Sequence, residues 1–245
     1  MKKFQYLTIA AVALAGLAAP VSSIAAEYDS HGAITFEASD DPTGPIDPTD
    51  PEKPIDPVDP LDPDGPGEGT AGPLSIDYAS SLDFGTQKIS SVNETYKAKA
   101  QKYQDSEGGE KIGPNFVQVT DNRGLETGWS LQVKQNDQFA TDEGDVLTGA
   151  QVSFKNGNVV TASTSAKPTG KATIALAPTD EYTDVMTAAD KQGAGTYLLA
   201  WGDNEATGAE SIELTVPGAT TKYAKQYTTT FTWQLTDTPG NETSE

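Results

Sequence analysis

Hydrophobic and polar residues alternate with a period of two over most of the chain beyond Leu74. These stretches are rich in Thr, Val and Tyr, and Gly, Asn, Asp and Pro interrupt them at short intervals. Successive side chains of a strand point to opposite faces, so this period is typical of half-buried β-strands. The predicted strands are 74–78, 82–89, 95–101, 116–120, 128–134, 151–154, 159–162, 171–177, 195–201, 211–216 and 227–236.

So many short strands in one segment predict an all-β fold. We expect an antiparallel β-sandwich, immunoglobulin-like or related, with a barrel as the alternative architecture. One short helix is expected over residues 180–190, because Met186, Ala188 and Ala189 favour a helix there. The β-branched residues Thr183 and Val185 argue against a long helix in this segment.

The last predicted strand alternates most regularly. One face carries Tyr227, Thr229, Phe231, Trp233 and Leu235, and the other carries Thr228, Thr230, Thr232, Gln234 and Thr236. An earlier segment repeats the pattern, with Trp129, Leu131 and Val133 opposite Ser130 and Gln132. The tripeptide Trp-x-Leu therefore occurs twice, and each copy places its Trp and its Leu on one face of a strand.

Each Trp-Leu pair has two interpretations. It fills the core, where a buried aromatic side chain contributes several kcal/mol, or it lies in a groove and stacks on the apolar faces of sugar rings. We keep both open. The candidate ligand-binding residues are Trp129, Leu131, Trp233, Leu235 and Arg123, which is the only arginine of the chain.

The first residues have the order of a targeting segment. Lys2 and Lys3 precede an apolar run from Leu7 to Ala19, and small residues follow up to Ala26. This order predicts a secretory signal peptide over residues 1–26. A retained membrane anchor is the weaker interpretation, since the run is shorter than the roughly 20 residues that span a bilayer.

The composition changes after the signal peptide. Residues 40–70 are dominated by Asp, Pro and Gly, and a nine-residue unit occurs twice, as Ile46–Pro54 and Ile55–Pro63. Proline fixes φ and removes a donor, the aspartates repel one another, and little apolar surface is present. We therefore predict an extended linker over 40–70.

This linker divides the mature chain. A short N-terminal segment, residues 27–39, precedes it, and the β-domain follows at residues 71–239. We expect residues 240–245 to form a disordered tail. A domain of this length buries enough surface to be stable without disulfides, and the chain has no cysteine.

Charge narrows the possible partners. The formal net charge is -20, and removal of the signal peptide, which holds two lysines and no acid, makes it about -22. Nucleic acid and anionic membranes carry the same sign and are disfavoured as partners. We also expect no membrane span in the mature chain.

Catalytic chemistry is weakly represented. The chain has one histidine, no cysteine, no Gly-x-Ser-x-Gly elbow and no phosphate-binding loop, so we expect no enzyme activity and no cofactor. A glycosidase needs only two carboxylates and stays an alternative. The acidic loops at 142–145 and 203–205 are better explained as surface turns than as Ca²⁺ sites, since neither has EF-hand spacing.

Several segments together resemble one family. The chain is similar to WxL-domain cell-surface proteins of low-GC Gram-positive bacteria such as enterococci, lactobacilli and listeriae. The matching pieces are the signal peptide, the segment ending Gly32-Ala33-Ile34-Thr35-Phe36, the Asp-Pro linker, Leu82-Asp83-Phe84-Gly85, Val119-Thr120-Asp121-Asn122-Arg123-Gly124 with Gly128-Trp129-Ser130-Leu131, and Phe231-Thr232-Trp233-Gln234-Leu235-Thr236-Asp237-Thr238-Pro239. One Trp-x-Leu is weak evidence, whereas two in their flanking contexts are specific.

The resemblance implies a function and a location. It implies a secreted protein held non-covalently on peptidoglycan or another cell-wall glycan at the cell surface. It also implies a complex with neighbouring surface proteins, including a membrane-anchored partner that binds the WxL domain. The alternative is an adhesin or complex subunit whose domain binds that protein partner, or host matrix, instead of glycan. The chain shows no LPxTG sorting signal and no apolar tail.

Overall fold

The structure is a computed structural model that describes residues 26–178 and 181–238. The chain divides into two units, Met1–Phe36 and Glu37–Glu245. In the first unit, residues 26–36 form neither helix nor strand. The predicted signal peptide, apart from Ala26, and the predicted tail at 240–245 lie outside the described residues.

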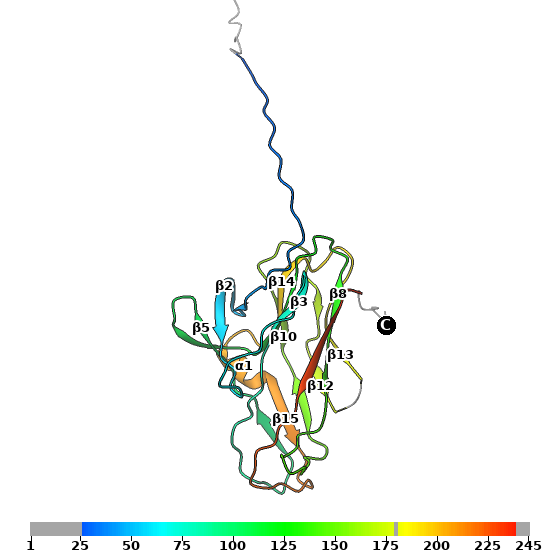
Figure 1. Ribbon diagram of the computed structural model, residues 1–245. Coiled ribbons are helices and arrows are strands. Elements are labelled where there is room, and N and C mark those ends of the chain that lie inside the picture. The colour runs from blue at the N-terminus through cyan, green and yellow to red at the C-terminus, as the bar shows by residue number, and fades with distance from the viewer. Residues whose placement is uncertain (1–25, 179–180, 239–245) are drawn as a thin grey trace, which may run out of the picture. The chain divides into compact units, whose positions relative to one another are not determined.

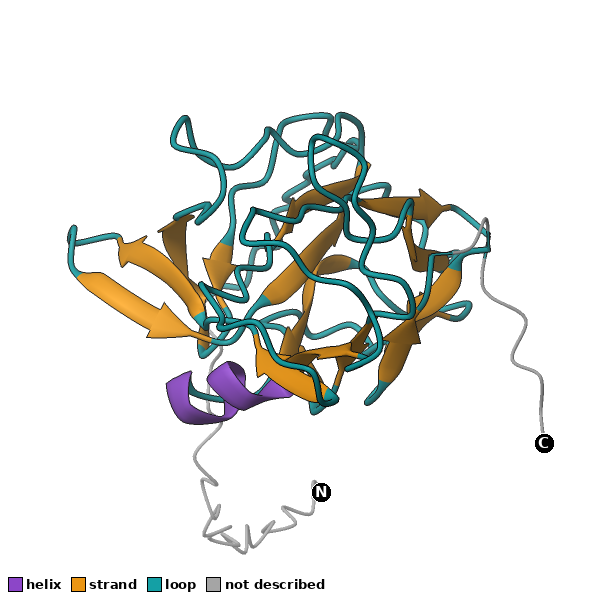
Figure 2. Cartoon of the chain, turned by 90° about the horizontal axis from the view of Figure 1, so that it is seen from below, coloured by secondary structure: helices purple, strands orange, loops and turns teal. Residues whose placement is uncertain are grey.

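The second unit is built almost entirely from strands (Figure 1). They are β1 (Ile46–Asp47), β2 (Asp50–Pro57), β3 (Leu74–Ala79), β4 (Glu94–Lys97), β5 (Gln101–Asp105), β6 (Glu110–Gly113), β7 (Phe116–Asp121), β8 (Trp129–Gln135), β9 (Gln151–Phe154), β10 (Gly157–Val160), β11 (Thr169–Gly170), β12 (Ile174–Leu176), β13 (Thr183–Ala188), β14 (Gly195–Trp201), β15 (Ile212–Val216) and β16 (Phe231–Thr236). Helix α1 (Glu205–Ser211) is the only helix among the described residues, and Figure 2 shows it in purple.

The strands form four antiparallel sheets. Their orders are β1-β2-β5-β6, β10-β14-β7-β3, β11-β13-β8-β16 and β12-β9-β15-β4. The prediction of an all-β antiparallel fold is confirmed, and the barrel alternative is not adopted. Two predicted strands, 151–154 and 195–201, match β9 and β14 at both ends.

Two local predictions are wrong. Residues 82–89 form no strand, and the segment predicted as a helix at 180–190 contains strand β13 instead. Pairing with β8 decides the conformation of β13, because it buries Val185 and Met186 in the core. The one helix lies at α1, where Asn204 caps the first turn and Thr207 completes a capping box.

The sheet β10-β14-β7-β3 is buried on both faces. On β14, Tyr197, Leu199 and Trp201 belong to the main core, which this sheet shares with the sheets of β8 and β15. The intervening residues Leu198 and Ala200 belong to a second apolar cluster on the opposite face. All six residues of β7 are buried. A sheet buried on both faces needs a cover on each side.

That second cover comes from the Asp/Pro segment. The structure shows strands β1 and β2 where an extended linker was expected at 40–70, and β2 pairs with β5 as well as with β1. Ile55 is only 4% exposed and lies in the second cluster with Tyr103 and Phe116. The composition argument failed because Ile46 and Ile55, the first residues of the two nine-residue units, both pack against the sheet.

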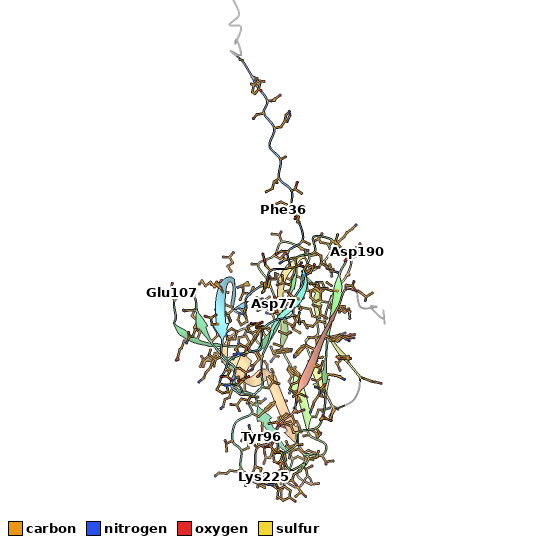
Figure 3. The ribbon with its side chains drawn as sticks, viewed as in Figure 1. Phe36, Asp77, Tyr96, Glu107, Asp190 and Lys225 are labelled. Atoms are coloured by element: carbon orange, nitrogen blue, oxygen red, sulfur yellow. The ribbon has the colours of Figure 1, made fainter. Side chains whose placement is uncertain are left out.

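A buried polar network joins this cover to the central sheet. The amide of Gln118 on β7 accepts from the Ile46 backbone N–H at 2.9 Å and donates to the Gly44 carbonyl at 3.0 Å. The same amide donates to Asp77 Oδ2 at 2.9 Å. Asp77 also accepts from the hydroxyls of Ser75 and Thr120, both at 2.6 Å. Figure 3 labels Asp77 inside the domain.

Burial sets the ionisation of this carboxyl. Asp77 is 6% exposed, and desolvation raises its pKa, while the hydrogen bonds from Ser75, Thr120 and Gln118 act in the opposite direction. Because desolvation is the larger effect, the folded protein binds a proton at Asp77 more tightly than the unfolded chain does.

The first prediction tests whether the Asp/Pro segment is part of the folded domain. Ile55→Ala should lower the free energy of unfolding by about 2–5 kcal/mol, because it empties a buried site. Val58→Ala is the control, since Val58 is 44% exposed, and it should change stability by less than about 0.5 kcal/mol. Urea denaturation measures both. Equal values for the two variants would mean that β2 does not pack in solution.

The second prediction concerns Asp77 and pH. As the pH falls through the raised pKa of Asp77, the unfolding free energy of the wild type should increase relative to that of Asp77→Asn. The increase should be complete below about pH 3.8, the ordinary pKa of an aspartate in the unfolded chain. The measurement is the unfolding free energy of both proteins across pH 3–7. Subtracting one curve from the other removes the contribution of the other carboxylates, which both proteins share. Parallel curves would show that the folded state leaves the pKa of Asp77 unchanged.

Candidate functional site

The two Trp-x-Leu segments lie on neighbouring strands. Strand β16, the red strand of Figure 1, pairs with β8 in antiparallel register. Leu235 lies opposite Leu131, and Trp233 lies opposite Val133. Side chains directly opposite each other project to the same face of a sheet. The two tripeptides, about a hundred residues apart in sequence, therefore contribute to one apolar surface that faces the main core.

The first tripeptide is completely enclosed. Trp129 and Leu131 have no exposed surface, and the Trp129 indole donates to the Gly193 carbonyl at 3.1 Å. Gly193 has φ of +80°, and a Cβ at this position would lie 2.6 Å from the Trp129 Nε1. Only glycine fits there. In this structure, neither Trp129 nor Leu131 can contact a ligand on the surface.

The second tripeptide lies at the margin of the same core. Trp233 and Leu235 are partly buried and pack against the enclosed residues. The ring of Trp233 lies 6.2 Å from that of Trp201, which is 1% exposed. β16 is an edge strand, because β8 is its only neighbour in the described sheet. These two side chains therefore close the core at the edge of the sheet and keep part of their surface accessible.

Arg123 is a structural residue of the loop between β7 and β8. Its guanidinium binds Asp121 with both oxygens engaged, at 2.9 Å to Oδ1 and 2.8 Å to Oδ2. It also donates to the Gly128 carbonyl at 2.8 Å. The Asp121 side chain is fully buried, and its hydrogen bonds raise the pKa of Arg123. Arg123 thus fixes the chain just before Trp129, with little of its own charge left for a ligand.

The middle residues of the tripeptides face away from the core. Ser130 and Gln234 project to the outer face of the sheet, because they alternate with the core residues of β8 and β16. Sequence reasoning assigned these residues to a polar face but did not treat them as candidates. The alternation of residues was enough to place both side chains on a polar face, but it did not predict that the two strands pair with each other.

The acidic loops do not gather into a metal centre. Lys225 forms ion pairs with Glu143, at 2.5 Å, and with Asp145, at 3.5 Å, at the end of the domain labelled in Figure 3. Asp203 accepts hydrogen bonds from Asn204 and Thr207 at the start of α1. Within residues 26–178 and 181–238, no three His, Cys, Asp or Glu side chains are arranged to hold a metal ion. The described part also contains no helix of the length and apolarity needed to cross a membrane.

Together, the fold and the paired strands define an all-β domain with its two Trp-x-Leu segments in one sheet. The family model for WxL domains, described as surface cell wall-binding, matches residues 23–239. The chain therefore belongs to the WxL family, which binds cell walls and is not an enzyme family, and its location is the cell surface. No curated protein and no solved structure matches the chain.

The third prediction separates the two tryptophans by stability. Trp129→Ala should cost about 3–5 kcal/mol, because it removes a completely buried ring and its hydrogen bond. Trp233→Ala should cost about 1–3 kcal/mol, since its ring is only partly buried. Chemical denaturation measures both. A Trp233→Ala protein that keeps its full stability and loses wall binding would place Trp233 at the ligand instead of the core margin.

Proposed function

We propose that this domain holds the protein non-covalently on peptidoglycan, or on another uncharged glycan of a Gram-positive cell wall. The observation that carries the proposal is the formal charge of -20 on the whole chain, which belongs to a wall-binding family. Gram-positive walls combine peptidoglycan with anionic teichoic polymers, and a strongly acidic protein is repelled by the latter. Local polar and apolar contacts with the glycan must then supply the affinity.

The lysines do not form a basic surface that could bind the anionic wall polymers. Lys97, Lys99 and Lys102 would make a locally basic face if their charges were free. However, Lys97 forms ion pairs with Glu213 and Glu210, and Lys99 pairs with Asp83 at 2.7 Å. Only Lys102 of this group has no ion pair within the described residues. A basic patch for anionic polymers is therefore a poor explanation of attachment.

A second candidate function is assembly with a protein partner, such as a membrane-anchored surface protein. The observation that favours it is the free edge of β16. The backbone carbonyl of Thr230 accepts from the Asn136 backbone N–H at 3.0 Å. Hydrogen-bonded residues alternate along an antiparallel pair, so the backbone groups of Thr232, Gln234 and Thr236 also bond to β8. The backbone groups of the residues between them point to the open edge, where a partner's strand can add.

A sedimentation experiment separates the two functions. The purified mature chain is mixed with peptidoglycan that has been stripped of protein and of anionic polymers. A glycan-binding domain sediments with this material alone, whereas a subunit held by a protein sediments only when wall proteins are supplied. Failure to bind stripped peptidoglycan at any concentration tested would overturn the proposed glycan function.

The fourth prediction concerns salt. Raising the salt concentration from 0.1 M to 1 M shortens the Debye length from about 10 Å to about 3 Å and screens repulsion from the wall. Retention on intact cells should therefore stay equal or increase in 1 M NaCl, which quantitative blotting of cell and supernatant fractions measures. Circular dichroism shows that the fold is unchanged by salt. Release of folded protein by 1 M NaCl would mean that ionic contacts hold it.

A further inference from the structure

The outer face of the sheet β11-β13-β8-β16 carries an ordered row of hydroxyl groups. Thr169 pairs with Thr187, Thr187 with Ser130, and Ser130 with Thr236, so one hydroxyl side chain comes from each of the four strands. Neighbouring strands are about 4.8 Å apart, so the row places hydroxyls at regular intervals across the sheet. That interval is comparable to the length of one pyranose unit in an extended glycan.

None of these hydroxyls is committed to another group of the described protein. Ser130 is 6% exposed, and its oxygen is buried between its neighbours without a hydrogen-bond partner in the described part of the chain. A buried hydroxyl without a partner costs free energy, and a ligand recovers this cost only where a small side-chain shift of the neighbouring threonines brings the oxygen within its reach. The hydroxyls of Thr169, Thr187 and Thr236 likewise bond to no other group among the described residues.

Amide side chains continue the polar surface beside the hydroxyl row. The next row crosses three strands through Asp184, Gln132 and Gln234. The Gln132 amide donates to Asp184 at 2.7 Å, and Gln234 is exposed with its amide unbound in the described structure. Amides offer both donors and acceptors, which suits the hydroxyl and acetamido groups of wall sugars.

The face is electrically neutral although the protein is acidic. Its two charged side chains, Asp184 and Lys134, have opposite signs, and Lys134 lies 5.2 Å from the ring centre of Tyr182. The outer face of the sheet β12-β9-β15-β4 contrasts with it, since Glu213 there forms ion pairs with Lys97 and Lys155. A neutral surface rich in hydroxyls and amides matches an uncharged glycan and lacks the cations that an anionic polymer requires.

We infer that the outer face of the sheet β11-β13-β8-β16 is the surface on which the wall glycan lies. Uncharged sugar hydroxyls and acetamido groups bind along the row formed by Thr169, Thr187, Ser130 and Thr236. This inference rests on the proposed function, because it names the surface by which the domain would bind peptidoglycan. In it, each Trp-x-Leu segment puts its apolar residues in the core and its middle residue on the binding face.

The test removes two hydroxyls without changing side-chain shape. The double variant Thr187→Val and Thr236→Val keeps β-branched residues of high strand propensity, so the fold is retained. Two lost hydrogen bonds should weaken binding to stripped peptidoglycan about tenfold in a sedimentation isotherm. The variant with Ser at both positions restores the hydroxyls and should bind within about twofold of the wild type.

A matched control comes from the other sheet. Thr95 and Thr215 are also paired strand threonines, and their hydroxyls lie 3.3 Å apart on the outer face of β4 and β15. Replacing both by Val should leave binding unchanged. Thermal melting of each variant confirms that it is folded before binding is compared.

The outcomes are distinguishable. If the wild type binds stripped peptidoglycan and the Thr187 and Thr236 valine variant binds as well, this face is not the glycan surface, while the proposed function stands. An equal loss in the Thr95 and Thr215 control would overturn the assignment in the same way. If the valine variant loses retention on intact cells but still binds stripped peptidoglycan, the face holds a protein instead. If the wild type does not bind, the proposed function itself fails.

Discussion

The burial of the sheet β10-β14-β7-β3 on both faces is the constraint on which the rest of the domain depends. One face shares the main core with the Trp-x-Leu sheet, and the other needs its own apolar cover. The Asp/Pro segment supplies this cover through Ile46 and Ile55, with the Gln118 amide fastening its backbone. A segment of low apolar content is therefore ordered because two well-placed side chains and one buried amide meet a surface that must be covered.

Alternation was sufficient to predict the class of fold, because period two survives wherever one face of a strand is buried. It located β9 and β14 to the residue. It could not predict β2, since proline and aspartate argue for a linker on average and the decisive partner, β5, is far away in sequence. It also failed for β13, where intrinsic preference was weak and pairing with β8 decided the conformation.

The candidate site was predictable only in part. Residue type and spacing identified the two Trp-x-Leu segments and the polar residues between them, but the sequence contains no information on which strands are neighbours. The register of β8 with β16 joins six residues of each strand into two faces, one apolar and one polar. Arg123 illustrates the limit, since a lone arginine in an acidic chain looks like a ligand contact, and only the structure shows it bound to Asp121.

The two faces of the Trp-x-Leu sheet impose different demands, and one sequence motif meets both. The inner face must pack rigidly, because the hydroxyl row on the outer face keeps its spacing only while the strands hold their register. Enclosed Trp129, with its indole bonded to the Gly193 carbonyl, fixes β8 in that register, and Trp233 fixes the edge strand against Trp201. A change of register by one residue would bring the tryptophans to the solvent and the hydroxyls into the core. If the outer face is the glycan surface, as we infer, the aromatic residues are indispensable for wall binding without touching the wall, because they determine which side chains face it.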